Sequence, residues 1–260
     1  MKAVILAGGL GTRISEESHL KPKPMIEVGG KPILWHIMKI YSSFGVNDFV
    51  ICCGYKGYVI KEYFANYFLH NSDVTFDMQN NTMTVHDNHS EPWKVTLVDT
   101  GLETGTLGRL RFVERYLSGE KRFHFTYGDG VSDINLNKLL ESHQASNRLI
   151  TVTAVQPPGR FGALKIKGND ITEFQEKPTG DNNWISGGFF VIDNDVFKQL
   201  SDFQSSEMWE QAPMEFFTQN NQVNCFKHQG FWQPMDTLRD KNYLEDLFLK
   251  QEAPWATWEK

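Results

Sequence analysis

The densest run of chemically useful residues lies near the start of the chain. An apolar segment, residues 3–6, leads into Gly8-Gly9-Leu10-Gly11. Glycines let backbone N–H groups approach a ligand and point the same way, which forms an anion-binding concavity. Arg13 follows directly after Thr12, and Lys23 lies between two prolines ten residues later. Clustered N–H donors and two cations of different reach suit the oxygens of a triphosphate.

Two common phosphate-binding loops do not fit this run. A P-loop ends its glycines with Gly-Lys-Ser or Gly-Lys-Thr, whereas Gly11 is followed by Thr12 and Arg13. A dinucleotide fingerprint needs a third glycine where Ile14 stands, and an acidic residue at the end of the second strand. The second predicted strand, residues 49–53, ends in Cys-Cys-Gly instead. The glycine loop at residues 8–11 is therefore neither a P-loop nor a dinucleotide-binding loop.

Two aspartates are candidates for binding a metal ion. Asp129 stands in Tyr127-Gly128-Asp129-Gly130, directly after a buried predicted strand, and Asp236 precedes the last predicted helix. Ligands of open α/β sheets bind at the carboxyl ends of strands. Two carboxylates beside a triphosphate suit Mg²⁺, which takes one or two protein carboxylates plus phosphate oxygens and water. Taken singly, Asp129 could be a turn residue and Asp236 a helix N-cap.

These motifs together resemble those of the sugar-phosphate nucleotidyltransferases. Members of that family carry Gly-Gly-x-Gly-Thr-Arg after the first strand and Pro-Lys-Pro downstream, and residues 8–13 and 22–24 match both. Asp129 and Asp236 match the family's two metal aspartates in motif and order. The resemblance extends from about residue 3 to 247. It implies a Rossmann-like three-layer α/β/α nucleotidyltransferase fold with a mostly parallel central sheet, and a Mg²⁺ cofactor.

The resemblance also assigns binding residues in this chain. Glu176-Lys177-Pro178 is similar to the family's Glu-Lys-Pro, in which the acid holds sugar hydroxyls and the lysine the sugar phosphate. The sugar-phosphate site is then expected to include Gly162, Glu176, Lys177 and Gly187. The nucleotide site is expected to include Leu6, Ala7, Gly8, Gly9, Leu10, Gly11, Thr12, Arg13, Lys23, Thr104, Arg109 and Gly128.

The implied reaction needs no general base. A sugar 1-phosphate is already an anion, so its oxygen can attack the α-phosphorus of a nucleoside triphosphate. The catalyst has to hold two anions together and offset their repulsion. Arg13 and Lys23 are the expected catalytic cations: Lys23, with Lys177, near the reacting centre, and Arg13 on the departing pyrophosphate.

The base is expected to be read by Arg109. Residues 105–110 read Gly-Thr-Leu-Gly-Arg-Leu, with arginine where relatives using UTP or dTTP have a small residue. Together with Thr104 and the 72–99 region, this resembles the members that use CTP and glucose 1-phosphate, which supply CDP-sugars for O-antigen synthesis. Arg109 could instead face solvent, or pair with Glu103 or Glu114. UTP or dTTP as substrate, or a non-catalytic nucleotide-sugar sensor, are the alternatives.

An α/β fold has to position these residues. The 260-residue chain is 40% hydrophobic, and we expect a single domain, residues 1–260, with a β-hairpin insert at 72–99. The pattern predicts strands at 3–6, 49–53, 95–98, 123–127, 150–155, 161–166, 171–174, 184–192 and 223–227. It predicts helices at 32–45, 58–69, 105–116, 135–146 and 214–218, and a closing helix.

Composition narrows the function classes. A net charge of −6 argues against a nucleic-acid surface, and no apolar run approaches the ~18 residues of a membrane helix. We therefore expect neither nucleic-acid nor membrane partners. The three cysteines have no metal or redox spacing, which favours a reducing compartment, and we expect a cytoplasmic protein. The apolar residues of the insert predict a homo-oligomer, with a hexamer as one candidate assembly. Trp255 and Trp258 are expected on a surface or against a partner subunit.

Overall fold

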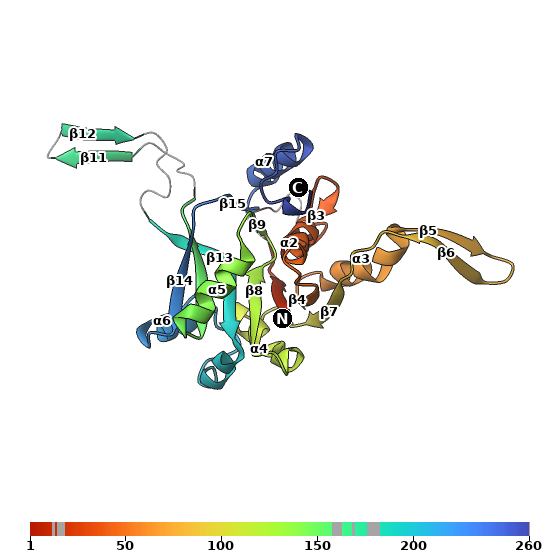
Figure 1. Cartoon of the computed structure of the whole chain (residues 1–260), viewed down its shortest axis with the longest axis horizontal. Coiled ribbons are helices and arrows are strands. Elements are labelled where there is room, and N and C mark those ends of the chain that lie inside the picture. The colour runs from red at the N-terminus through yellow and green to blue at the C-terminus, as the bar shows by residue number, and fades with distance from the viewer. Residues whose placement is uncertain (12–13, 15–18, 158–162, 168–169, 176–182, 260) are drawn as a thin grey trace.

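A seven-stranded sheet forms the centre of the computed structural model, which describes residues 1–11, 14, 19–157, 163–167, 170–175 and 183–259 (Figure 1). Its strand order is β14-β10-β13-β8-β1-β4-β7. Neighbouring strands are parallel except at β13, which runs antiparallel to both β8 and β10. The strands are β1 (Ala3–Ala7), β4 (Asp48–Cys53), β7 (Lys94–Asp99), β8 (Arg122–Tyr127), β10 (Ile150–Val155), β13 (Ile185–Asp193) and β14 (Val223–His228). The predicted mostly parallel sheet is confirmed.

Helices cover both faces of this sheet. The helices are α2 (Ile33–Ser42), α3 (Gly57–His70), α4 (Thr106–Phe112), α5 (Leu136–Ser146), α6 (Ala212–Gln219) and α7 (Leu238–Leu249). One core packs residues of α2, α3, α5 and α7 against the sheet, and a second core packs residues of α4 and α6 against it. The fold therefore has the three layers that the resemblance implied.

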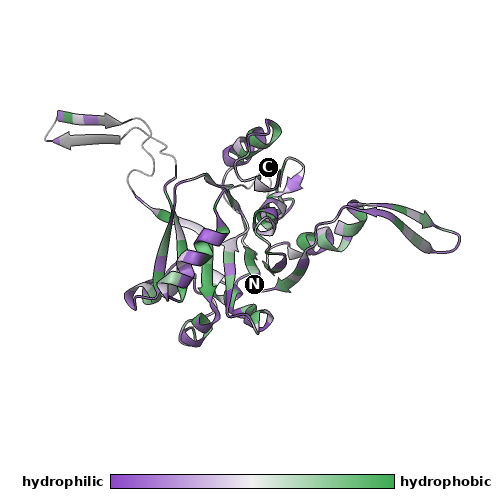
Figure 2. Ribbon diagram, viewed as in Figure 1, coloured by the Kyte–Doolittle hydropathy of each residue, from purple (hydrophilic) through white to green (hydrophobic). Residues whose placement is uncertain are grey.

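The strands are central because their sequences are apolar without alternation. All five residues of β1 are buried, and hydrophobic residues run along the central strands (Figure 2). Strands covered by helices on both faces have no solvent side, so they need no polar positions. The registers Ala3↔Phe49 and Ala3↔His124 place the carboxyl ends of β1, β4 and β8 at one edge of the sheet. Functional residues at the ends of these strands therefore meet.

Short elements complete that edge. A 3-10 turn, η2 (Lys23–Met25), and a small ladder of β9 (Gly130–Ser132) with β15 (Trp232–Pro234) lie there. The remaining short elements are β2 (Glu27–Val28), β3 (Lys31–Pro32), η3 (Glu114–Leu117), η5 (Asn194–Gln199) and η6 (Thr257–Glu259). None of the described helices has the length and apolar character that a bilayer crossing needs.

Two hairpins extend from opposite ends of the molecule (Figure 1). The predicted hairpin within 72–99 is confirmed as β5 (Ser72–Asp77) and β6 (Thr82–Asn88). The second pairs β11 (Ala163–Lys167) with β12 (Asp170–Gln175). Both are separate from the central sheet, since each forms its own two-stranded sheet.

The C-terminal segment packs into the core, which corrects the surface position expected for Trp255. Its side chain is fully buried and stacks on Phe231, with ring centroids 5.5 Å apart. Trp255 Nε1 donates a hydrogen bond to Nδ1 of His36, 3.3 Å away. Burial lowers the pKa of His36 to about 4, so its neutral imidazole can accept that bond while Nε2 donates to the carbonyl of Val28.

Candidate active site

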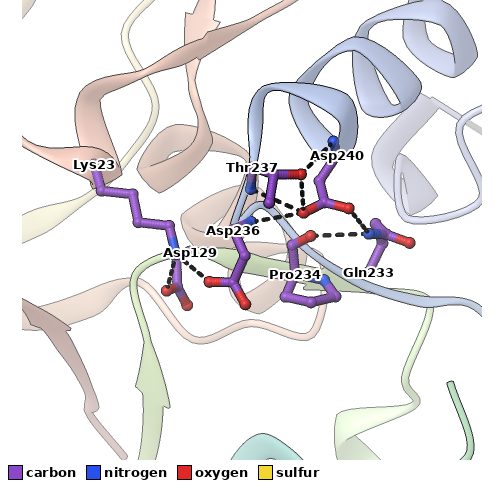
Figure 3. A network of polar contacts seen from close by, with 7 residues as sticks. All are labelled: Lys23, Asp129, Gln233, Pro234, Asp236, Thr237 and Asp240. Carbon is purple, nitrogen blue, oxygen red and sulfur yellow. Dashed lines mark hydrogen bonds and ion pairs between the residues drawn. The ribbon is translucent and has the colours of Figure 1, made fainter. Parts of the chain in front are cut away.

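The β9–β15 ladder brings the two candidate metal ligands together. Asp129 lies in the turn between β8 and β9, and Asp236 follows β15. The ladder pairs Gly130 with Pro234, and the amide of Met235 donates to the Asp129 carbonyl at 2.7 Å. Residues more than a hundred positions apart in the chain thus present their carboxylates at one point (Figure 3). The structure thus brings the two candidate metal ligands close together, while their role as metal ligands stays a prediction.

Lys23 joins the two carboxylates. Its Nζ lies 2.7 Å from Asp129 Oδ2 and 2.6 Å from Asp236 Oδ1, and the residue is only 8% exposed. Figure 3 shows the lysine reaching from η2 to both acids. Its proline neighbours fix the backbone there, because proline restricts its own φ and the conformation of the residue before it. One buried ammonium group therefore holds two carboxylates that would otherwise repel each other.

Asp236 is not the N-cap of α7, so that interpretation is wrong. Thr237 is the N-cap, and its hydroxyl accepts from the amide of Asp240 in a capping box. The Asp240 carboxylate in turn accepts from the amides of Asp236 and Thr237, at 3.1 and 2.9 Å. This network sets the position of Asp236 at the helix entrance, and leaves its carboxylate directed at Lys23 (Figure 3).

The glycine loop follows β1 and lies beside the acids. A Cβ atom on Gly128 would lie 2.6 Å from the carbonyl oxygen of Leu6, so only glycine allows β1 and β8 to end this close together. Gly11 has a φ of +66°, a conformation that favours glycine. Apart from its chain neighbours, a Cβ on Gly9 would have no atom of the described residues within 4 Å, so there is open space on that side of the loop. Two residues of the same motif, Thr12 and Arg13, lie outside the described residues.

Arg109 lies against the first glycine of this loop. A Cβ on Gly8 would lie 2.2 Å from Arg109 Nη1, and a Cβ on Gly54 would lie 2.5 Å from the same atom. The residue is 5% exposed, so it does not face solvent. Its described partners are the Thr100 hydroxyl and the carbonyls of residues 53, 101 and 102, and include neither Glu103 nor Glu114. Both competing interpretations of Arg109 are therefore wrong.

A pocket of about 440 Å³ joins the glycine loop, Arg109 and the carboxylate cluster. The sequence predicted many of its lining residues: Leu6, Ala7, Gly8, Gly9, Leu10, Gly11, Lys23, Thr104, Arg109, Gly128, Asp129 and Asp236. It missed others: Ile14, Pro24, Leu102, Glu103, Gly105, Thr106, Tyr127, Ser206 and Met208. The pocket is thus formed at the carboxyl edge of the sheet, where the strand ends predicted it.

The segment 203–211 is the wall that sequence reasoning missed. Its carbonyls at Ser205 and Glu207 accept from the amides of Gly105 and Leu107, at 3.1 and 3.2 Å, and so cap the start of α4. A Cβ on Gly105 would lie 2.2 Å from the carbonyl oxygen of Glu207, and one on Gly108 would lie 2.1 Å from that of Ser205. The two glycines, three positions apart on one helix face, were the available signal.

The expected sugar-phosphate residues are described only in part. Gly162, Glu176 and Lys177 lie outside the described residues. Gly187 is buried and accepts from Trp232 Nε1 at 2.7 Å, and its Cα packs on Val155. It does not line the pocket described above. The place of Gly187 in the sugar-phosphate site therefore stays a prediction.

Among the described residues, no cluster of three or more His, Cys, Asp or Glu side chains could hold a metal ion. A metal at Asp129 and Asp236 would thus take two protein carboxylates. That number matches Mg²⁺ bound mainly through substrate phosphates and water, and it does not match a metal held by protein groups alone. The two carboxylates already share one cation, Lys23, so their arrangement fits a second positive charge at the same place.

Solved structures share this fold. HddC from Yersinia pseudotuberculosis superposes with a TM-score of 0.69, at 21% identity over 95% of this chain and 99% of that chain. A putative glucose-1-phosphate thymidylyltransferase from Bacillus anthracis gives a TM-score of 0.65 at 19% identity, covering 95% of this chain and 94% of that one. At these identities the likeness concerns the fold.

Sequence comparison is more specific. Residues 2–240 match the family model described as nucleotidyl transferase. A glucose-1-phosphate cytidylyltransferase of Salmonella typhimurium is 58% identical over 259 residues, covering 100% of both chains. A probable glucose-1-phosphate cytidylyltransferase of Bacillus subtilis is 38% identical and covers 99% of this chain and 100% of its own. The chain belongs to the nucleotidyl transferase family.

Proposed function

We propose that this protein transfers the cytidylyl group of CTP to α-D-glucose 1-phosphate, giving CDP-glucose and pyrophosphate. The observation that carries the proposal is a single pocket that joins a glycine loop, a buried arginine and the Lys23–Asp129–Asp236 cluster. A relative named for this reaction is 58% identical over the full length of both chains. The names of such relatives support the choice of both substrates.

The reaction is a displacement at phosphorus. A phosphate oxygen of glucose 1-phosphate forms a bond to the α-phosphorus of CTP while the bond from that phosphorus to the bridging oxygen of pyrophosphate breaks. The nucleophile carries its own negative charge, so the protein has to supply position and positive charge. Glycine-loop amides and the Lys23 ammonium are the described groups that can do so. Arg13 and Lys177 are further cations that we assign from the family resemblance.

The carboxylates of Asp129 and Asp236 would hold Mg²⁺. The bound ion would supply positive charge to the phosphate oxygens of both substrates. Lys23 is paired with both carboxylates. Once Mg²⁺ also neutralises these carboxylates, the Lys23 ammonium would be available to contact phosphate oxygens. The acids thereby set the position of the lysine as well as binding the metal.

Arg109 is the residue that we assign to base selection. Its Nη1 donates to the Thr100 hydroxyl and the Gly101 carbonyl, at 2.7 and 2.8 Å, and Nη2 donates to the Leu102 carbonyl at 3.1 Å. Nε and the second Nη2 hydrogen have no partner in the part of the chain that the structure describes. These two donors form a fork that matches the adjacent acceptors O2 and N3 of cytosine. Uracil and thymine carry a proton on N3 and would oppose it.

The β5–β6 hairpin supports the proposal of a homo-oligomer. Its register pairs Phe76 with Met83, and these two residues are 55% and 45% exposed. Met78 near the turn is 87% exposed. A lone two-stranded hairpin with exposed apolar side chains gains stability from a covering surface. A second copy of the chain is the occupant we propose, and a hexamer stays one candidate assembly.

Placement in the cytoplasm and a single domain over residues 1–260 also stay proposals.

The direct test crosses the four nucleoside triphosphates with several hexose 1-phosphates and measures pyrophosphate release. We expect the highest kcat/KM for CTP with glucose 1-phosphate. A higher value for UTP or dTTP would replace the proposed nucleotide, and no release with any pair would favour a nucleotide-sugar sensor.

Removing either acid should slow turnover. We expect Asp129→Ala and Asp236→Ala each to lower kcat by roughly 10²-fold or more, since each removes a major source of electrostatic stabilisation. Asp195→Ala is the matched control, because that carboxylate is 67% exposed and pairs only with its neighbour Lys198 among the described residues. Near-normal turnover of Asp236→Ala at saturating Mg²⁺ would exclude Asp236 from the site.

Removing Arg109 should reduce the preference for CTP over UTP. An unpaired buried donor costs about 1–3 kcal/mol, or roughly 5- to 150-fold in discrimination. We expect the CTP/UTP ratio of kcat/KM in Arg109→Ala to fall by that order, chiefly through CTP. Arg111→Ala is the control on the same helix, because Arg111 donates to the Phe203 carbonyl and does not line the pocket. A ratio unchanged in Arg109→Ala would place base selection elsewhere.

Polar residues on the hairpin should weaken assembly. We expect the wild-type chain to have an oligomeric mass by light scattering after gel filtration, and Phe76→Ser with Met83→Ser to have a lower one. Thr75→Ser with Thr84→Ser is the control, since this pair lies next to the apolar pair on the opposite face. Equal masses for wild type and the apolar double variant would contradict the proposed contact.

A further inference from the structure

Thr100 is a buried residue directly after β7, and its hydroxyl both donates and accepts a hydrogen bond. The residue is 0% exposed, and its Oγ1 donates to the carbonyl of Cys53 at 2.7 Å. Its amide donates to the same carbonyl at 2.9 Å. The hydroxyl hydrogen is therefore committed to β4, and the oxygen can only accept from its other neighbour. That neighbour is Nη1 of Arg109, 2.7 Å away.

The guanidinium group is fixed on several sides by this arrangement. Gly8 and Gly54 lie so near it that a Cβ on either would overlap with Nη1. The turn after Thr100 supplies two carbonyl acceptors, and Gly101 within it has a φ of +86°, which favours glycine. The Asp99 carboxylate accepts from the amide of Gly101 at 3.1 Å, which holds the turn. These neighbours therefore determine which N–H groups of the Arg109 guanidinium are hydrogen-bonded and which stay unpaired.

Within the described residues, no carboxylate lies at ion-pair distance from Arg109, and its acceptors are a hydroxyl and backbone carbonyls. Burial lowers the pKa of Arg109, which reflects the free-energy cost of a charge removed from water. A buried charge is tolerated when its donors are paired. The unpaired Nε and Nη2 donors thus favour a ligand with two adjacent acceptors.

We propose that Thr100 is a positioning residue for nucleobase selection, because its hydroxyl fixes the rotation of the Arg109 guanidinium. The proposal rests on the function given above, in which Arg109 reads cytosine. Without the hydroxyl acceptor, Nη1 would lose a partner and the guanidinium could turn toward the remaining carbonyls. The Nε–Nη2 fork would then no longer be held toward O2 and N3 of the base. Thr100 would not contact the nucleotide itself.

The test compares Thr100→Val, which removes the hydroxyl at nearly constant shape, with Thr100→Ser, which keeps it. We expect Thr100→Val to lower the CTP/UTP ratio of kcat/KM by ~10-fold, mainly through a higher KM for CTP, as follows from the loss of one buried hydrogen bond to a charged group. Thr100→Ser should stay within about twofold of wild type. Thr153→Val is the matched control, a buried threonine whose hydroxyl has no partner among the described residues and whose loss should leave the ratio unchanged.

Partial unfolding cannot imitate the expected result, because the ratio of two kcat/KM values does not depend on the fraction of active enzyme. If Thr100→Val does not fold, Thr100→Ala is measured in the same way and has to show the same fall. A ratio equal to wild type in the variants lacking the hydroxyl, with Arg109→Ala still reducing it, would overturn the role of Thr100 alone. A ratio unchanged in Arg109→Ala would instead overturn the base assignment on which it rests.

Discussion

The Arg109 guanidinium is buried among backbone carbonyls, with no carboxylate of the described residues at ion-pair distance, and much of the pocket depends on this interaction. Carbonyl oxygens can approach it only where the chain lies very close, which explains the glycines at positions 8 and 54 and the φ of +86° at Gly101. The same close packing brings the ends of β1, β4 and β7 around one helix, α4. The contacts that hold the Arg109 guanidinium therefore also hold the ends of these strands together.

The second buried cation is stabilised differently. Lys23 lies between Asp129 and Asp236, and removing the lysine would leave two like charges side by side in a partly buried place. The pocket thus has a carboxylate-rich end, which suits a metal and phosphates, and another end where backbone carbonyls surround the Arg109 guanidinium. A nucleoside triphosphate has the matching polarity, with its anionic tail at one end and an uncharged base at the other.

The sequence predicted the parts of the site that depend on strand ends. An apolar run followed by glycines, and acids after apolar runs, place residues at the carboxyl edge of a parallel sheet, and Gly8, Lys23 and Asp129 do lie there. It could not predict the wall formed by segment 203–211 or the partners of Arg109. The wall contacts join backbone atoms of residues about a hundred positions apart, and Arg109 takes most of its acceptors from backbone carbonyls, which no side-chain pattern encodes. The N-cap interpretation of Asp236 was wrong for a local reason, since Thr237 caps the helix one position later.

The central claim is that Arg109 Nε–H donates to N3 of cytosine, an acceptor that uracil replaces with an N3–H donor. Nitrogen-15 NMR of the arginine side chains measures this bond directly, with the Arg109 Nε–H signal assigned by its absence from Arg109→Lys. Saturating CTP should shift this signal and slow its exchange with solvent, because the proton becomes hydrogen-bonded, whereas UTP at saturation should produce neither effect. Equal changes with CTP and UTP, or no change with CTP, would contradict the account.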